Sequence, residues 1–261
     1  MIPLWLAFVG MVAIVLLSSY GGLILARFRT SRIGGDEETP VSTIVAAMVA
    51  LLGFLLTFTF GLTAGRLGTR KSLLLDEVNA IETTFLRTRL IPDSHGPAVR
   101  ALLKEYVDIR VELPRQPEKI EPMIKRSEQL QGLMWSHAAA LAEADIRNPA
   151  IAALFVESLN QMLDLQTKRV TVSMIHRLPP IMWVVLMALT VLSMSGVGYL
   201  FGMSGKANWL LVLALSLAFS SVMVLNFDLD RSGSRRIGLA RVEMEPMIDL
   251  QRRIAEQMRN D

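Results

Sequence analysis

Residues 41–65 read VSTIVAAMVALLGFLLTFTFGLTAG and hold no charged side chain. A helix of this length can cross the roughly 30 Å hydrocarbon core of a membrane. Two stripes repeat at i, i+4 spacing inside it, so each keeps to roughly one side of the helix, and about 100° separates them. The first stripe is small: Gly53, Thr57, Gly61 and Gly65. The second stripe is bulky and apolar: Phe54, Phe58 and Leu62.

The two stripes predict different contacts. Small residues let another helix approach closely in a membrane, so we expect the small stripe to pack against a helix. The bulky stripe must then point elsewhere. If copies of this helix form a ring, the bulky side chains meet near the axis, which is the layout of a hydrophobic pore constriction. The alternative is that the phenylalanines simply pack inside a helix bundle.

Three further windows lack charge, so the chain has four apolar segments in all. The windows are 2–26, 39–65, 178–205 and 207–227 in a chain of 261 residues that is 52% hydrophobic. Each is long enough for a membrane-spanning helix, and no β-rich segment appears. The first window is longer than the apolar part of a signal peptide and lacks basic residues before it. We therefore predict an all-α membrane protein with four transmembrane helices.

The predicted organisation has four parts. Residues 1–65 hold transmembrane helices 1 and 2, and residues 66–177 form a helical cytosolic domain. Residues 178–227 hold transmembrane helices 3 and 4, and residues 228–261 form a cytosolic C-terminal tail that ends in an amphipathic helix. With the amino terminus inside, ten of the fourteen Lys and Arg residues near span ends lie in the cytoplasm. This bias predicts that both termini and the long middle segment are cytoplasmic.

The segment after the second span carries a polar face at helical spacing. Its members are Asp76, Asn79, Thr83 and Arg87, and later helices add Tyr106, Arg110, Asp164 and Arg169. We expect these eight residues to form a cytosolic polar network. The alternative is a solvated face with ordinary ion pairs.

Residue types needed for common enzyme chemistry are missing or scattered. The chain has no cysteine, and His95, His137 and His176 lie far apart in sequence, so we predict no metal site and no cofactor. Hydrolase and nucleotide-binding motifs are absent. A calcium loop could open at Asp228, but Leu239 occupies the position of its final glutamate. The net charge of +3 is too small to indicate nucleic-acid binding, and we expect no enzyme.

The order of the predicted spans and the run from Leu51 to Leu62 resemble the bestrophin channels. The chain is similar over most of residues 39–250 to a group of uncharacterised bacterial bestrophin-like proteins. The segments that carry this resemblance are Asp76–Ile81, Leu102–Val107, Ser158–Asn160, Arg177–Pro180 and the tail motif Asp228, Asp230 and Arg231. The resemblance implies a protein of the bacterial inner membrane that forms a ring-shaped homo-oligomer, with a pentamer favoured, and a pore neck made of Phe54, Phe58 and Leu62.

Two functions follow from these patterns. The first is a bestrophin-like ion channel whose partners are lipid and small inorganic ions. Arg66 lies one further i+4 step along the bulky stripe, so it could form a positive ring at the inner pore mouth and favour anions such as chloride. The second is a non-conducting scaffold or sensor whose cytosolic domain binds a partner. A transporter ranks lower, because no span holds an ionisable residue within its core.

Overall fold

The protein is described by a computed structural model that covers residues 3–33, 38–143, 149–174, 178–205, 208–231 and 244–260. Within these ranges every regular element is a helix, which confirms the predicted all-α class. The helices are α1 (Leu4–Ile33), α2 (Glu38–Arg87), α3 (Gly96–Glu112), a 3-10 turn η1 (Pro117–Lys119), α4 (Ile120–Glu143), α5 (Pro149–Met174), α6 (Pro180–Ser204), α7 (Trp209–Arg231) and α8 (Glu245–Asn260).

Four of the described helices are long and apolar enough to cross a membrane: α1, α2, α6 and α7. The predicted four-span count is therefore confirmed. Local sequence explains the ends of α6. Pro180 begins it, where a proline in the first turn costs no hydrogen bond, and Gly205 ends it in the left-handed conformation with φ of 68°.

The chain divides into two compact units, and α2 contributes to both. The apolar unit contains α1, α2 as far as Leu67, α6 and α7. The polar unit contains α2 from Gly68 onward together with α3, η1, α4, α5 and α8. No proline interrupts the chain between Val41 and Ile91, so α2 runs for 50 residues without a break.

Glycines bring α1 and α6 into close contact in the apolar unit. A Cβ atom added at Gly22 would lie 1.9 Å from the backbone oxygen of Ser195, and one added at Gly198 would lie 1.7 Å from that of Ser19. These glycines therefore let the backbones of α1 and α6 approach each other closely. Next to this contact, an apolar core comprises Val15, Leu52, Leu56, Leu186, Met194 and Met223.

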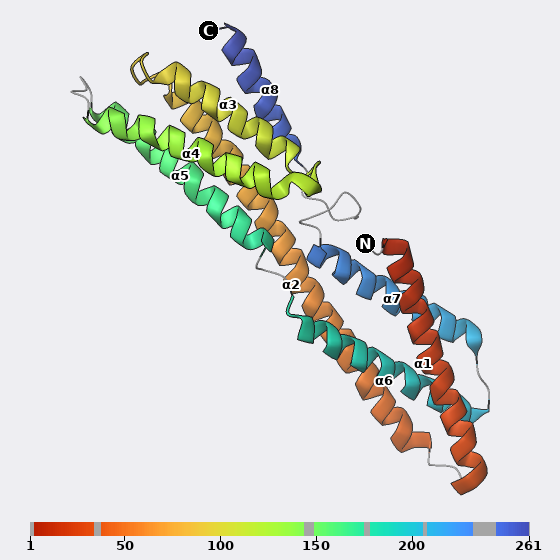
Figure 1. The fold of residues 1–261 in the computed structure, drawn as a ribbon. Coiled ribbons are helices and arrows are strands. Elements are labelled where there is room, and N and C mark those ends of the chain that lie inside the picture. The colour runs from red at the N-terminus through yellow and green to blue at the C-terminus, as the bar shows by residue number, and fades with distance from the viewer. Residues whose placement is uncertain are drawn as a thin grey trace. The chain divides into compact units, whose positions relative to one another are not determined.

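The polar unit has a larger core. Figure 1 shows α3, α4 and α5 running alongside the second part of α2, with α8 beside α3. Fully buried side chains here include Phe85, Leu103 and Phe155. The apolar side of α8 joins this core through Met247, Leu250 and Ile254, which confirms the amphipathic tail helix.

The end of α7 differs from the sequence-based boundary. We expected the span to end at Phe227 and an irregular tail to begin at Asp228, but α7 continues to Arg231. Asp230 accepts a hydrogen bond from the backbone N–H of Leu178 at 2.9 Å, and its carboxylate lies 3.7 Å from Arg66. Because the carboxylate of Asp230 has these two partners, it can be buried, and α7 can extend past Phe227.

Adjacent glycines on α1 provide a test of the α1–α6 contact. Gly22→Ala would drive a methyl group into backbone atoms of α6, so we expect a loss of about 1–3 kcal/mol in the free energy of unfolding. Gly21→Ala is the control, because an added Cβ there meets no described atom within 4 Å. Thermal unfolding in detergent measures both. Equal stabilities for the two variants would contradict this packing.

Candidate functional site

The bulky stripe of α2 lies opposite the face that packs within the chain. Leu52 and Leu56 are buried in the apolar core. Phe54 and Phe58 lie about 200° around the helix from them. Their side chains are 66% and 53% exposed, and that of Leu62 is 36% exposed. A single copy of the chain therefore leaves this stripe uncovered, and its role as a pore neck stays a prediction.

The small stripe of α2 is also open. A Cβ added at Gly53, Gly61 or Gly65 would meet none of the described atoms within 4 Å. The Thr57 hydroxyl donates a hydrogen bond to the Gly53 carbonyl at 2.9 Å, so it is satisfied within α2 itself. The close helix contact that we expected for this stripe is not made among the described residues of one chain. Another copy could make it.

Polar side chains join α2 to α7 near the end of the apolar unit. Asn226 is fully buried, and its Nδ2 donates to the backbone oxygens of Val222 at 3.1 Å and Leu56 at 3.4 Å. Thr63 Oγ1 donates to Asn226 Oδ1 at 3.3 Å. These bonds satisfy a side-chain amide inside an apolar environment, where an unpaired amide would be costly.

Arg66, which we expected at the inner pore mouth, lies beside the tail motif. Its Nη1 is 3.7 Å from Oδ1 of Asp230, and its side chain is partly exposed. Asp228 and Asp230 are both buried, and Arg231 is the last residue of α7. The positive ring remains a prediction, and the Asp230 carboxylate partly balances the charge of Arg66.

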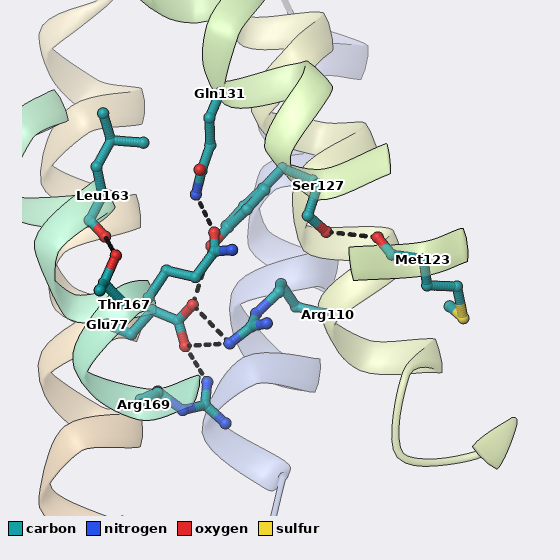
Figure 2. Close-up of polar contacts among 10 residues, drawn as sticks. Glu77, Arg110, Met123, Ser127, Gln131, Leu163, Thr167 and Arg169 are labelled. Carbon is teal, nitrogen blue, oxygen red and sulfur yellow. Dashed lines mark hydrogen bonds and ion pairs between the residues drawn. The ribbon is translucent and has the colours of Figure 1, made fainter. Parts of the chain in front are cut away.

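In the polar unit a buried carboxylate gathers the side chains of three helices. Figure 2 shows Glu77 of α2 facing Arg110 of α3 and Arg169 of α5. Glu77 is fully buried, and Arg110 Nη2 lies 3.0 Å from its Oε1. Arg169 Nη1 is paired with Oε2. One negative charge therefore balances two positive charges in a place where water is largely excluded.

Tyr106 extends this cluster toward α4. Its hydroxyl lies 3.0 Å from Glu77 Oε1 and 2.8 Å from Gln166 Oε1, so two acceptors share its single proton. Gln131 Nε2 of α4 donates to the same oxygen of Gln166. Burial raises the pKa of Tyr106, and burial lowers the pKa of Arg169 to about 10. At neutral pH the tyrosine is therefore neutral and Arg169 keeps its charge.

The other predicted network residues lie elsewhere in the polar unit. An open pocket of about 360 Å³ between α2 and α5 is lined by Asp76, Asn79, Thr83 and Asp164, together with Ala80, Gln161, Leu165 and Lys168. Arg87 donates to the backbone oxygen of Leu154. The eight residues thus separate into a buried cluster around Glu77, which holds three of them, a pocket lined by four, and the helix contact of Arg87.

Glu77, the centre of the buried cluster, was not among the predicted network residues. Glu77 is charged, yet it falls between Leu74, Val78 and Ile81 on the apolar face of its helix. A carboxylate at such a position needs a buried hydrogen-bond or ion-pair partner. Its place on the apolar face could therefore have indicated a buried polar cluster. Gln131 and Gln166 offered no comparable signal, because glutamine on an amphipathic helix is common at the edge of the buried face.

Comparison with known families identifies the chain. A family model described as Bestrophin-like domain matches residues 12–235. The chain belongs to the bestrophin-like family. This confirms the resemblance inferred from its sequence, and the four-span helical fold is the bestrophin fold. Its apolar helices make this bestrophin-like chain a membrane protein.

Solved structures share this fold at low sequence identity. A variant of a bacterial bestrophin homologue from Klebsiella pneumoniae is 15% identical, with a TM-score of 0.68 over 94% of this chain and 99% of that one. A variant described only as a membrane protein is 13% identical, with a TM-score of 0.69 over 95% and 98% of the two chains. A search of curated proteins finds no match. At such identities the bestrophin-like chain shares a fold, and its activity must be argued from its own residues.

Two glutamates on α2 allow the buried cluster to be tested. Glu77→Gln would leave Arg110 and Arg169 facing a neutral amide, so we expect the free energy of unfolding to fall by about 3–5 kcal/mol. Glu82→Gln is the matched control, because Glu82 pairs with Arg253 at 3.1 Å on the surface. That exposed pair should contribute about 1 kcal/mol or less. Denaturant unfolding in detergent measures both, and similar losses would show that Glu77 is not the central charge.

Proposed function

We propose that this bestrophin-like protein is an ion channel formed by a ring of identical chains, with five copies favoured. Phe54, Phe58 and Leu62 form its hydrophobic neck. The observation that carries the proposal is that this bulky stripe is uncovered on the side of α2 opposite its packing within the chain. The family match supports it, because the chain shares the fold of bacterial bestrophin homologues.

Ring geometry explains why both stripes of α2 are uncovered. If α2 is the innermost helix of each subunit, its buried face points outward toward α1, α6 and α7. The opposite face, with Phe54, then points to the ring axis. The flank with Gly53 has space for a neighbouring subunit, since an added Cβ there meets no described atom of its own chain. Small residues suit such close contacts between helices.

A neck of this kind would control flow without any charge. Phenylalanine and leucine side chains around a narrow axis offer no hydrogen bonds to water, so the constriction empties of water and blocks hydrated ions. A small widening of the ring lets water return and ions pass. The threonines next to the stripe do not oppose this, because the Thr57 and Thr59 hydroxyls bond to backbone oxygens of α2.

The charged residues near the spans indicate how the chain is oriented in the membrane and which ions it conducts. We place the channel in the bacterial inner membrane with both termini and the polar unit on the cytoplasmic side, since most Lys and Arg residues near the spans then lie inside. We propose anions as the permeant ions. The partly exposed side chain of Arg66, one helical turn beyond Leu62, supports this choice.

Bilayer recordings test the neck. Phe54→Ala and Phe58→Ala enlarge the constriction and remove apolar surface, so we expect a larger open-state current and a smaller closed fraction. Phe60→Ala is the control: Phe60 is also exposed on α2 but lies off the stripe. A Phe60 effect equal to that of Phe54 would contradict the neck.

Native mass spectrometry of the wild-type protein tests the ring independently of conduction. Five copies are expected, and a monomer or a dimer would overturn the proposal. A ring without current in any variant would instead favour a non-conducting scaffold.

The selectivity proposal has its own test. Arg66→Gln would leave Asp230 without its cation, so the local charge becomes negative and the anion preference should fall. Reversal potentials in asymmetric potassium chloride measure this preference. Lys71→Gln is the control, since Lys71 is an exposed cation five residues further along α2. Unchanged reversal potentials in the Arg66 variant would show that this residue does not select the ion.

A further inference from the structure

Two of the three histidines of the chain face each other in the polar unit. Nδ1 of His95 lies 3.1 Å from Nδ1 of His137, and the two rings meet edge to face with centroids 5.4 Å apart. His95 is the N-cap residue immediately before α3, and His137 lies on α4, 42 residues away. Both side chains are half-buried, so they are held in place while ions can still reach them.

The backbone at His95 is fixed by its turn. Its N–H donates to the Pro92 carbonyl at 3.0 Å, and its own carbonyl accepts from the Val99 N–H at 3.0 Å. Among the described residues its imidazole makes no capping bond to the start of α3. The ring is therefore available to meet α4, where His137 provides a second ring nitrogen.

The protonation states of the two imidazole rings determine what this pair can bind. A neutral imidazole has one N–H and one lone pair, so two facing Nδ1 atoms can share only a single proton between them. When the ring that holds this proton changes tautomer, the proton moves from Nδ1 to Nε2 of the same ring. Each neutral ring then carries its hydrogen on Nε2, and two Nδ1 lone pairs face the same point. A zinc ion bound at 2.0–2.1 Å with tetrahedral angles holds its nitrogen ligands about 3.3 Å apart. The observed spacing is close to this value.

We propose that His95 and His137 form a binding site for a borderline divalent transition metal of the Zn²⁺, Ni²⁺ and Cu²⁺ class. Both histidines bind through Nδ1, and water completes the coordination. Within the described ranges no third His, Cys, Asp or Glu completes a three-residue cluster, so the site has open positions. Imidazole favours these metals, whereas Mg²⁺ and Ca²⁺ prefer oxygen ligands.

Bound metal would link the turn before α3 to α4. These segments are distant in sequence, and a ligand that binds only the folded chain stabilises it according to its concentration and affinity. The site is separate from the proposed neck and does not depend on channel activity. It also revises the sequence-based expectation of no metal site, because spacing along the chain could not show that His95 and His137 meet.

Thermal unfolding of the tag-free, full-length protein tests this site. Saturating Zn²⁺ or Ni²⁺ should raise the melting temperature by about 5 °C, while equal Mg²⁺ should not. His95→Gln and His137→Gln should each abolish the increase. His176→Gln is the matched control and should retain it. No increase in the wild-type protein, or an equal loss in all three variants, would overturn the proposal.

Electron paramagnetic resonance with Cu²⁺ gives a second readout that does not depend on stability. The wild-type signal should show coupling to two imidazole nitrogens, and His137→Gln should reduce this to one or none. His176→Gln should leave two. Coupling to two nitrogens that survives in the His137 variant would place the metal elsewhere and overturn the assignment.

Discussion

The continuity of α2 is the constraint on which the rest of the structure depends. Because no proline interrupts Val41–Ile91, one helical repeat runs through both units. Its buried face carries Leu52 and Leu56 in the apolar unit, and Leu74 and Ile81 in the polar unit. Each unit therefore packs its other helices against its own part of this helix. The side chains that this face does not bury, among them the bulky stripe, stay exposed on a single chain.

The buried polar side chains of α2 are paired with residues of other helices in both units. In each unit, α2 supplies a polar side chain whose partners come from helices distant in sequence. Thr63 meets Asn226 of α7, and Glu77 meets Arg110 and Arg169. Removing such groups from water is costly unless their hydrogen bonds are replaced, so each contact holds only when several helices are in place together. This makes the arrangement of helices specific in a way that apolar packing alone does not.

Much of the fold could be predicted because it depends on local pattern. The length of the hydrophobic windows located the four spans. The amphipathic pattern of the tail predicted α8, whose apolar side buries Met247, Leu250 and Ile254. The candidate site was harder. We predicted one network, but Tyr106, Arg110 and Arg169 meet at Glu77, whereas Asp76, Asn79, Thr83 and Asp164 line a separate pocket.

The sequence by itself determined the class of the protein, the number of spans and the stripes of α2, because these follow from hydrophobicity and helical periodicity along one segment. Only the tertiary structure decided which segments meet. It paired Arg66 with Asp230, centred a charge cluster on Glu77 and brought His95 to His137 across 42 residues. Such pairings depend on how helices pack in space, and the periodicity of one helix holds no information about the partner that will face it.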